Sequence, residues 1–238
     1  MPRLSVICWV TVAYGGLLAS SSIIAGCSES QSDAESSFHR ELTKAHIGDS
    51  DTIEVYDQLV GDRDLDRLAK LSELRRLVLD QTTITDDGMP SLVGLSNLEH
   101  LRLRGARIGD AGLQQVCRLD RLRSLNLPHA AFSDQGLEGL TRLKHLKQLR
   151  FGSPNVSDAG LKFVAQMKEL RFLHLIGVPI TDEGLKHLHS MKQLESLYLD
   201  DTGVTDQGLE ALWRAIPVHL HINQQHHDRD PRKHAHRD

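Results

Sequence analysis

Carboxylates at equal intervals are the first residues in this sequence whose type and spacing could do chemistry. One aspartate falls in every step of 24 residues: Asp62, Asp86, Asp110, Asp134, Asp158, Asp182 and Asp206. Such a column could bind metal ions or supply acids and bases, but a site needs its acids only once. An acid in the first turn of a helix is useful in every copy, and the Thr or Ser that usually precedes it can cap free N–H groups. We therefore interpret the column as structural, and the six glycines that follow it, from Gly88 to Gly208, as a sign of close backbone packing between copies.

The C-terminus, "HHDRDPRKHAHRD", is the second candidate for chemistry. Neutral imidazoles can bind zinc, copper or nickel, and the tract offers His226, His227, His234 and His236. Their spacing matches no fixed metal site, and the composition predicts a disordered tail over residues 224–238. A metal-binding role of this tail stays open as the alternative function.

Motifs of enzymes are absent from the rest of the sequence. We find no G-x-S-x-G, no H-E-x-x-H, no P-loop and no glycine-rich dinucleotide turn, and we expect neither an enzyme nor a cofactor. The 238 residues include 28 Lys and Arg against 32 Asp and Glu, a net charge of -4. This balance argues against a nucleic-acid binder, which would normally be strongly basic.

The spacing of the leucines predicts the strands and helices that would hold the side chains of any functional site. The pattern L-x-x-L-x-L begins at six equally spaced residues: Leu74, Leu98, Leu122, Leu146, Leu170 and Leu194. Alternation within the pattern predicts a short strand with its leucines turned inward. Three later apolar residues, such as Leu185, Leu188 and Met191, share one face of a short helix. Neither face can be buried within one copy, so the copies must stack, and we predict seven repeats and a closing strand.

The repeated pattern resembles bacterial leucine-rich-repeat proteins, and its T-D-x-G-L block is similar to the cysteine-containing subclass known from F-box proteins. The resemblance covers about 51–223. It implies an α/β fold, a right-handed leucine-rich-repeat solenoid with short parallel strands on the concave face and short helices on the convex face, and a habit of binding proteins. The subclass cysteines are replaced by Leu, Thr or Ala and no F-box is present, so a ubiquitin-ligase role is not implied.

The N-terminus predicts the cellular location of the protein. An apolar stretch ends in Ile24-Ala25-Gly26-Cys27, which resembles the lipobox of bacterial lipoproteins. The resemblance implies that residues 1–26 are a signal peptide and that Cys27 is lipidated, which places the protein on the extracytoplasmic side of the cell envelope, anchored to a membrane. An uncleaved membrane anchor is the alternative. Residues 27–37, rich in Ser and acids, predict a flexible tether, and Phe38, Leu42 and Ile47 predict a helix that caps a repeat domain over residues 38–223.

Strand residues that point away from the core would line the concave face. They differ from repeat to repeat, as the residues of a binding surface do. Ten of them form the candidate partner-binding site: Arg76, His100, Arg102, Arg104, Asn126, Arg150, Phe172, His174, Tyr198 and Asp200. Arginines and exposed aromatics are the types that become hot spots, although an ordinary solvated sheet face is the alternative. No acid lies on the same columns between Arg102, Arg104 and Arg150, so we predict an anionic partner, either a protein or an envelope polymer, bound by a monomer.

Overall fold

The computed structural model describes residues 36–223 and the backbone of residues 225–226. The predicted signal peptide, Cys27 and nearly all of the tether lie outside the described residues, as do the side chains of the His-rich tail. Among the helices that the structure describes, none is both long and apolar enough to cross a membrane.

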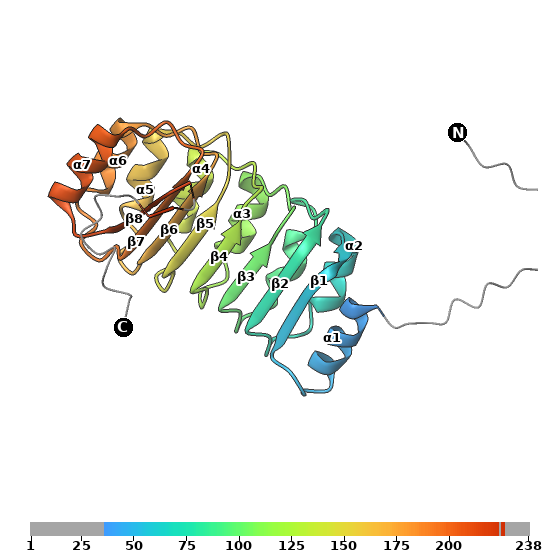
Figure 1. Ribbon diagram of the computed structural model, residues 1–238. Helices are drawn as coiled ribbons and strands as arrows, with labels where there is room; N and C mark the ends of the chain where they lie inside the picture. The colour runs from blue at the N-terminus through green and yellow to red at the C-terminus, as the bar shows by residue number, and fades with distance from the viewer. Residues whose placement is uncertain (1–35, 224, 227–238) are drawn as a thin grey trace, which may run out of the picture. The chain divides into compact units, whose positions relative to one another are not determined.

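One sheet runs through the whole repeat domain (Figure 1). Eight parallel strands follow one another in sequence order, and a ninth pairs antiparallel with the eighth. The strands are β1 Thr52–Val60, β2 Arg76–Thr82, β3 His100–Leu103, β4 Ser124–Leu127, β5 Gln148–Phe151, β6 Phe172–Ile176, β7 Ser196–Asp200, β8 His219–Ile222 and β9 Gln225–His226. Strand β9 extends the sheet two residues into the segment predicted as a disordered tail.

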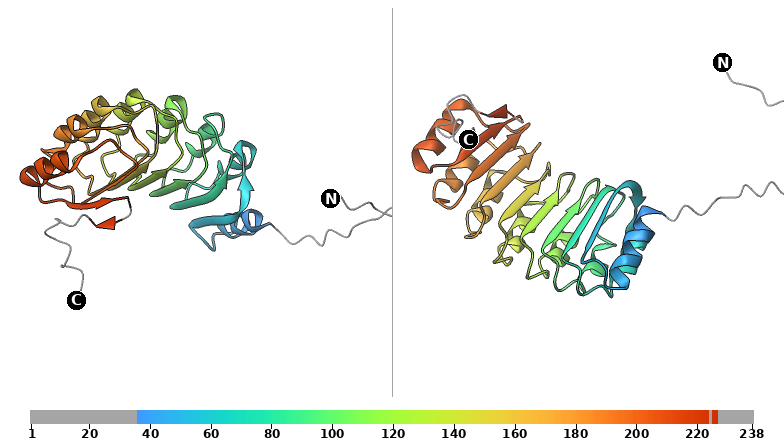
Figure 2. Two further views of the ribbon diagram at one scale, coloured as in Figure 1. Left: turned by 45° about the horizontal axis from the view of Figure 1, so that its top comes forward. Right: turned by 60° about the horizontal axis from the view of Figure 1, so that its bottom comes forward.

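One helix, α1 Ser37–His46, precedes the first strand, and short helices then return the chain from each strand to the next as far as β8. They are α2 Asp62–Leu65, η1 Asp66–Leu68, η2 Met89–Leu92, α3 Asp110–Val116, α4 Asp134–Leu140, η3 Asp158–Gly160, α5 Leu161–Val164, α6 Asp182–Leu188 and α7 Asp206–Ala215, where η marks a 3-10 helix. Figure 2 shows the strands on the inner side of a curved stack and the helices on its outer side. The predicted α/β leucine-rich-repeat solenoid is therefore confirmed.

A single apolar core fills the space between the sheet and the helices. The repeat leucines, such as Leu149 and Leu173 in neighbouring strands, are buried almost completely. Two rings, Phe132 and Phe151, pack with their centroids 5.2 Å apart inside this core. Because each coil buries its apolar face against its neighbours, the domain is stabilised as a stack and not coil by coil.

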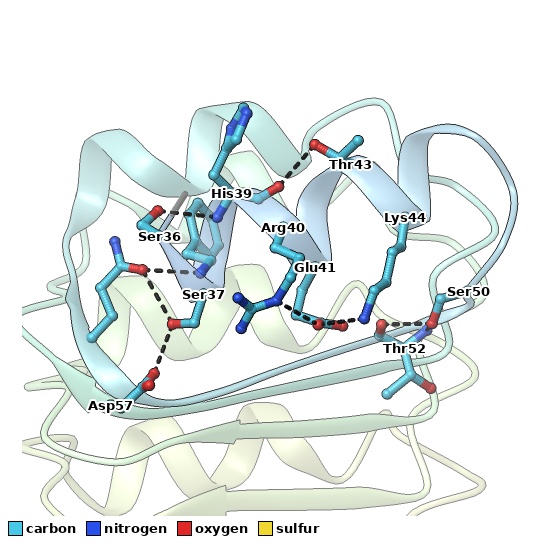
Figure 3. Close-up of polar contacts among 12 residues, drawn as sticks. Ser36, Ser37, His39, Arg40, Glu41, Thr43, Lys44, Ser50, Thr52 and Asp57 are labelled. Carbon is cyan, nitrogen blue, oxygen red and sulfur yellow. Dashed lines mark hydrogen bonds and ion pairs between the residues drawn. The ribbon is translucent and has the colours of Figure 1, made fainter. Parts of the chain in front are cut away.

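Helix α1 closes the N-terminal end of the core. Phe38 and Leu42 are buried against the first strand, as predicted. The Ser37 hydroxyl donates to Asp57 at 2.7 Å, and the hydroxyl of Ser36 accepts the His39 N–H at the start of the helix (Figure 3). The prediction was wrong for Ile47, which is 66% exposed, because the helix ends at His46 and the chain turns away from the core.

The aspartate column joins each coil to the next. The Asp158 carboxylate accepts hydrogen bonds from the N–H and the hydroxyl of Thr181, both at 2.7 Å. The same pair of bonds joins Asp62 to Thr85, Asp110 to Ser133, Asp134 to Ser157 and Asp182 to Thr205, while Asp86 bonds the N–H of Gly109. The Thr and Ser residues cap their own helices, as predicted. Most of the aspartates lie in the first turn of their own helices, as predicted, and their carboxylates also bind the following coil, which the sequence did not predict.

This contact explains the glycine column. A Cβ atom at Gly184 would overlap the Asp158 carboxylate, and the same carboxylate of the preceding coil faces each of the other five glycines. The coils pack closely at these glycines, as predicted, but the group nearest to each glycine is a side-chain carboxylate and not the backbone that the prediction named.

The column predicts a dependence of stability on pH. Hydrogen bonds from the Thr205 hydroxyl and N–H hold the pKa of the Asp182 carboxyl below its ordinary value of 3.8. A group with a depressed pKa in the folded state contributes stability above its unfolded pKa and loses it as the pH falls through the folded pKa. We expect Asp182→Asn to unfold more easily than the parent at about pH 6, and the difference to shrink below about pH 4. Urea unfolding followed by circular dichroism across this range measures it; a pH-independent difference would contradict the assignment.

Candidate functional site

The strand register assembles the predicted site in one row. Arg102, Asn126 and Arg150 are paired neighbours on β3, β4 and β5, and His174 and Tyr198 continue the row on β6 and β7. Neighbouring strands lie about 4.8 Å apart, so Arg102 and Arg150 are separated by roughly 10 Å of backbone. All five side chains are partly exposed on the face opposite the core.

Several basic residues of the predicted site are already paired with acids. Arg76 forms an ion pair with Glu54. Arg102 Nε lies 2.9 Å from the Asp80 carboxylate, and an Arg104 Nη atom lies 4.0 Å from the same group. No acid lies between Arg102 and Arg150 in their row, as the sequence indicates, but the expectation had not included Asp80 on β2, whose carboxylate partly neutralises Arg102 and Arg104. Asp80 reaches both from the neighbouring strand, which a comparison restricted to single columns does not detect.

Arg150 differs from these residues. No ion pair joins its guanidinium to an acid among the described residues, whereas Arg102 Nη2 donates to the Asp80 carboxylate at 2.9 Å. The Nε atoms of Arg150 and Arg102 are both buried without a hydrogen-bond partner among the described residues. Burial, and next the positive charge of Arg102, lower the pKa of its guanidinium. Removing a cation from water without an acceptor is costly. An anionic group of a binding partner would therefore gain the most binding free energy by pairing with Arg150.

A hollow of about 200 Å³ opens beside this guanidinium. Its lining residues are Arg102, Arg104, Asn126, Pro128, His129, Arg150 and Ile176, and we call it the basic hollow. Sequence reasoning missed His129, because this residue lies in the turn after β4, one position beyond the columns considered. Its Nδ1 accepts the Gly105 N–H at 3.1 Å, which fixes the ring against the hollow. The arginines in its wall supply N–H groups that can donate hydrogen bonds to a carboxylate.

A second hollow of about 210 Å³ adjoins the first and is partly aromatic. The wall of this aromatic hollow includes Gln148, Phe172, His174 and Tyr198, and it shares Asn126 and Arg150 with the basic hollow. Phe172 is 36% exposed, and Tyr198 stacks on His221 with ring centroids 4.0 Å apart. An apolar surface therefore lies directly beside the basic one.

Asp200 was predicted to contact a partner, but it is only 7% exposed. Its carboxylate lies 2.8 Å from His174 Nε2 and accepts a hydrogen bond from the N–H at that position. Asp200 thus orients the ring beneath the surface. Burial lowers the pKa of both His174 and His100, which leaves both rings neutral at pH 7 and the positive charge of the face on its arginines.

The remaining sequence candidates fall elsewhere. Cys117 is buried at the end of α3, and burial raises the pKa of its thiol to about 11, so the thiol stays protonated at neutral pH. Cys27 and the side chains of the weak metal candidates His226, His227, His234 and His236 lie outside the described residues.

Comparisons with known proteins agree with this architecture. A family model described as a leucine-rich repeat matches residues 94–117 and 191–212. These two stretches cover only part of the chain, and together with the stacked coils they support a leucine-rich-repeat fold. A search of curated protein sequences gives no match.

Two solved structures with TM-scores above 0.5 share the fold. Internalin C2 of Listeria monocytogenes is 19% identical with a TM-score of 0.52, over 78% of this chain and 92% of that one. The ectodomain of the Arabidopsis receptor kinase HAESA, in complex with an extended IDA peptide hormone, is 17% identical with a TM-score of 0.55, over 76% of this chain and 32% of that one. A leucine-rich-repeat protein of Leptospira interrogans has a TM-score of 0.49 at 17% identity, over 66% of this chain and 45% of that one.

Proposed function

We propose that this protein is a binding module that captures another protein on its concave face, with an acidic side chain of the partner seated in the basic hollow. The observation that carries the proposal is Arg150, whose Nε atom is buried beside the basic hollow without a hydrogen-bond partner and whose guanidinium forms no ion pair among the described residues. A carboxylate placed there would accept charge-assisted hydrogen bonds from Arg150 and Arg104, and it would supply the acceptor that Arg150 lacks within the described chain.

The aromatic hollow favours a protein over an envelope polymer as the occupant of this face. Phe172 and Tyr198 offer apolar area next to the arginines. Protein interfaces combine such aromatic anchors with a few desolvated charges. The two hollows meet at Asn126 and Arg150, so one segment of a partner could fill both.

Photo-crosslinking from the concave face tests this function. Gln148 lies on the wall of the aromatic hollow and is exposed, whereas Lys162 lies on the convex helix α5 and serves as a matched control. A photoreactive residue at position 148 in the native host should yield one dominant protein adduct, identifiable by mass spectrometry, that position 162 does not yield. Equal adducts from both positions would contradict a concave binding site.

We further propose that the module is held on the extracytoplasmic side of a bacterial membrane by lipid on Cys27. The support is the sequence Ile24-Ala25-Gly26-Cys27 after an apolar stretch. Stable anchoring takes two hydrophobic chains, which a lipoprotein modification supplies.

Cys27→Ser should leave an uncleaved precursor or release the protein from the membrane fraction. Fractionation of cells and intact-mass analysis of the purified protein measure both results. An unmodified Cys27 in the parent, with identical fractionation of the variant, would rule the anchor out.

A further inference from the structure

A second basic surface lies away from the concave site, on the side of the domain where the chain enters strands β4, β5 and β6. Three consecutive helix-to-strand loops form it: residues 117–123, 141–147 and 165–171. We call this surface the basic edge. Its loops carry eight Lys and Arg against two acids, Asp120 and Glu169, in a chain whose net charge is -4. The loops on either side, residues 93–99 and 189–195, carry no such excess.

Backbone hydrogen bonds stack these loops directly on one another. The Lys147 N–H donates to the Arg123 carbonyl at 2.8 Å, and the Arg171 N–H donates to the Lys147 carbonyl at 2.9 Å. Among the described residues, acids form ion pairs only at the two ends of this column, where Glu99 pairs with Arg123 and Glu195 with Arg171. The basic edge is therefore a strip of cations at the spacing of strands, about 4.8 Å, with the charge at its centre uncompensated by ion pairs within the described chain.

A hollow of about 650 Å³ on the convex side adjoins the basic edge. It lies between α3 and α4, and Arg118 and Arg142 of the edge form part of its wall. Gly139 leaves this space open, since the equivalent position of the next coil holds Phe163, which packs on the core. We call this hollow the amide groove, because Gln114, Gln115 and Gln135 line it together with Thr141. One acid, Glu138, also lies in its wall.

We propose that the basic edge and the amide groove together bind an acidic polysaccharide. Because Glu138 lies in the groove wall, the cations that would meet sugar carboxylates are Arg118 and Arg142 at the junction with the basic edge. Sugar hydroxyls would exchange hydrogen bonds with the amides. Gln115 Oε1 already accepts from Arg118 at 3.2 Å, which holds the two side chains together at the junction. The groove is mostly polar and has no aromatic side chain among its described lining residues, unlike the aromatic hollow of the concave face, so a sugar fits it better than a protein anchor.

Titration of the full-length protein with polygalacturonate by isothermal calorimetry tests this proposal. The parent should bind the polymer saturably and more weakly as salt rises. R118Q/R142Q should weaken binding by roughly tenfold or more, since each substitution removes a charge-assisted contact. Q114A/Q135A should weaken polygalacturonate binding by a similar order while leaving the affinity for inorganic polyphosphate unchanged.

Matched controls separate this surface from the concave one. Arg75 lies on the same side of the domain but outside the three loops, and Arg150 lies on the concave face. The variants Arg75→Gln and Arg150→Gln should therefore bind polygalacturonate with the affinity of the parent. Thermal unfolding verifies that each variant is folded. No binding by the parent would overturn the proposal. So would equal losses for polyphosphate and polygalacturonate in R118Q/R142Q with no effect of Q114A/Q135A, because the edge would then be an electrostatic surface without sugar recognition.

Discussion

Arg150→Glu is expected to weaken capture of the protein partner at least about a hundredfold. Truncating one member of a desolvated charge pair costs about 2–5 kcal/mol in binding, and reversal of the charge adds repulsion. The substitution should leave the fold intact, because the side chain points away from the core and its Nε makes no hydrogen bond within the described chain. The measurement is affinity for the partner identified by crosslinking, with the free energy of unfolding as a check.

Arg102→Gln is the matched control for Arg150→Glu. Arg102 is already paired with Asp80, and Arg104 stays within 4.0 Å of that carboxylate, so loss of one of these charges should change affinity by less than about tenfold. The parent affinity should fall as salt rises, since these charges are partly exposed. Similar losses from both substitutions would show that the partner senses general positive charge. No loss in Arg150→Glu would show that the basic hollow does not contact the partner.

Gly184→Ala is expected to destabilise the domain by about 2 kcal/mol, although alanine normally favours a helix over glycine. The new Cβ would overlap the Asp158 carboxylate, which its two bonds to Thr181 hold in place. Removal of the carboxylate by Asp158→Ala should cost a similar amount, about 2 kcal/mol, because the Thr181 N–H loses its acceptor. Denaturant unfolding of the purified domain measures both values.

The double variant Asp158→Ala/Gly184→Ala tests the contact more directly than either single substitution. Once the carboxylate is gone, the Cβ added at position 184 faces mainly the Asp158 Cα at 3.2 Å, and the helix preference of alanine offsets what remains. Gly184→Ala should therefore cost less than about 0.5 kcal/mol in the Asp158→Ala background. Asp120→Ala, at a loop aspartate outside the column, should stay within about 0.5 kcal/mol of the parent. Additive losses in the double variant would show that glycine is required for some reason other than the carboxylate.

Most of the fold was predictable from the sequence, since the period of 24 residues carries it. Leucines such as Leu149 and Leu173 recur at fixed offsets, and alternation within a strand decides which face each residue occupies. The same rule predicts Arg102, Asn126 and Arg150 in one row, and the strand pairing agrees. The terminal elements were less predictable, as the exposed Ile47 shows, because no neighbouring copy constrains them.

The repeat pattern establishes which residues share a face, whereas contacts between coils establish which of their polar groups are satisfied. Asp80 pairs with Arg102 across 22 positions of sequence, and Asp158 reaches Thr181 across 23. These partners lie on different coils, and whether they meet depends on side-chain length, direction and the space left by a residue such as Gly184. A repeat pattern encodes the position of each Cα but not the reach of its side chain. For that reason Arg150 could be recognised as the arginine of the concave row without an ion pair among the described residues only when its neighbours on both sides were in place.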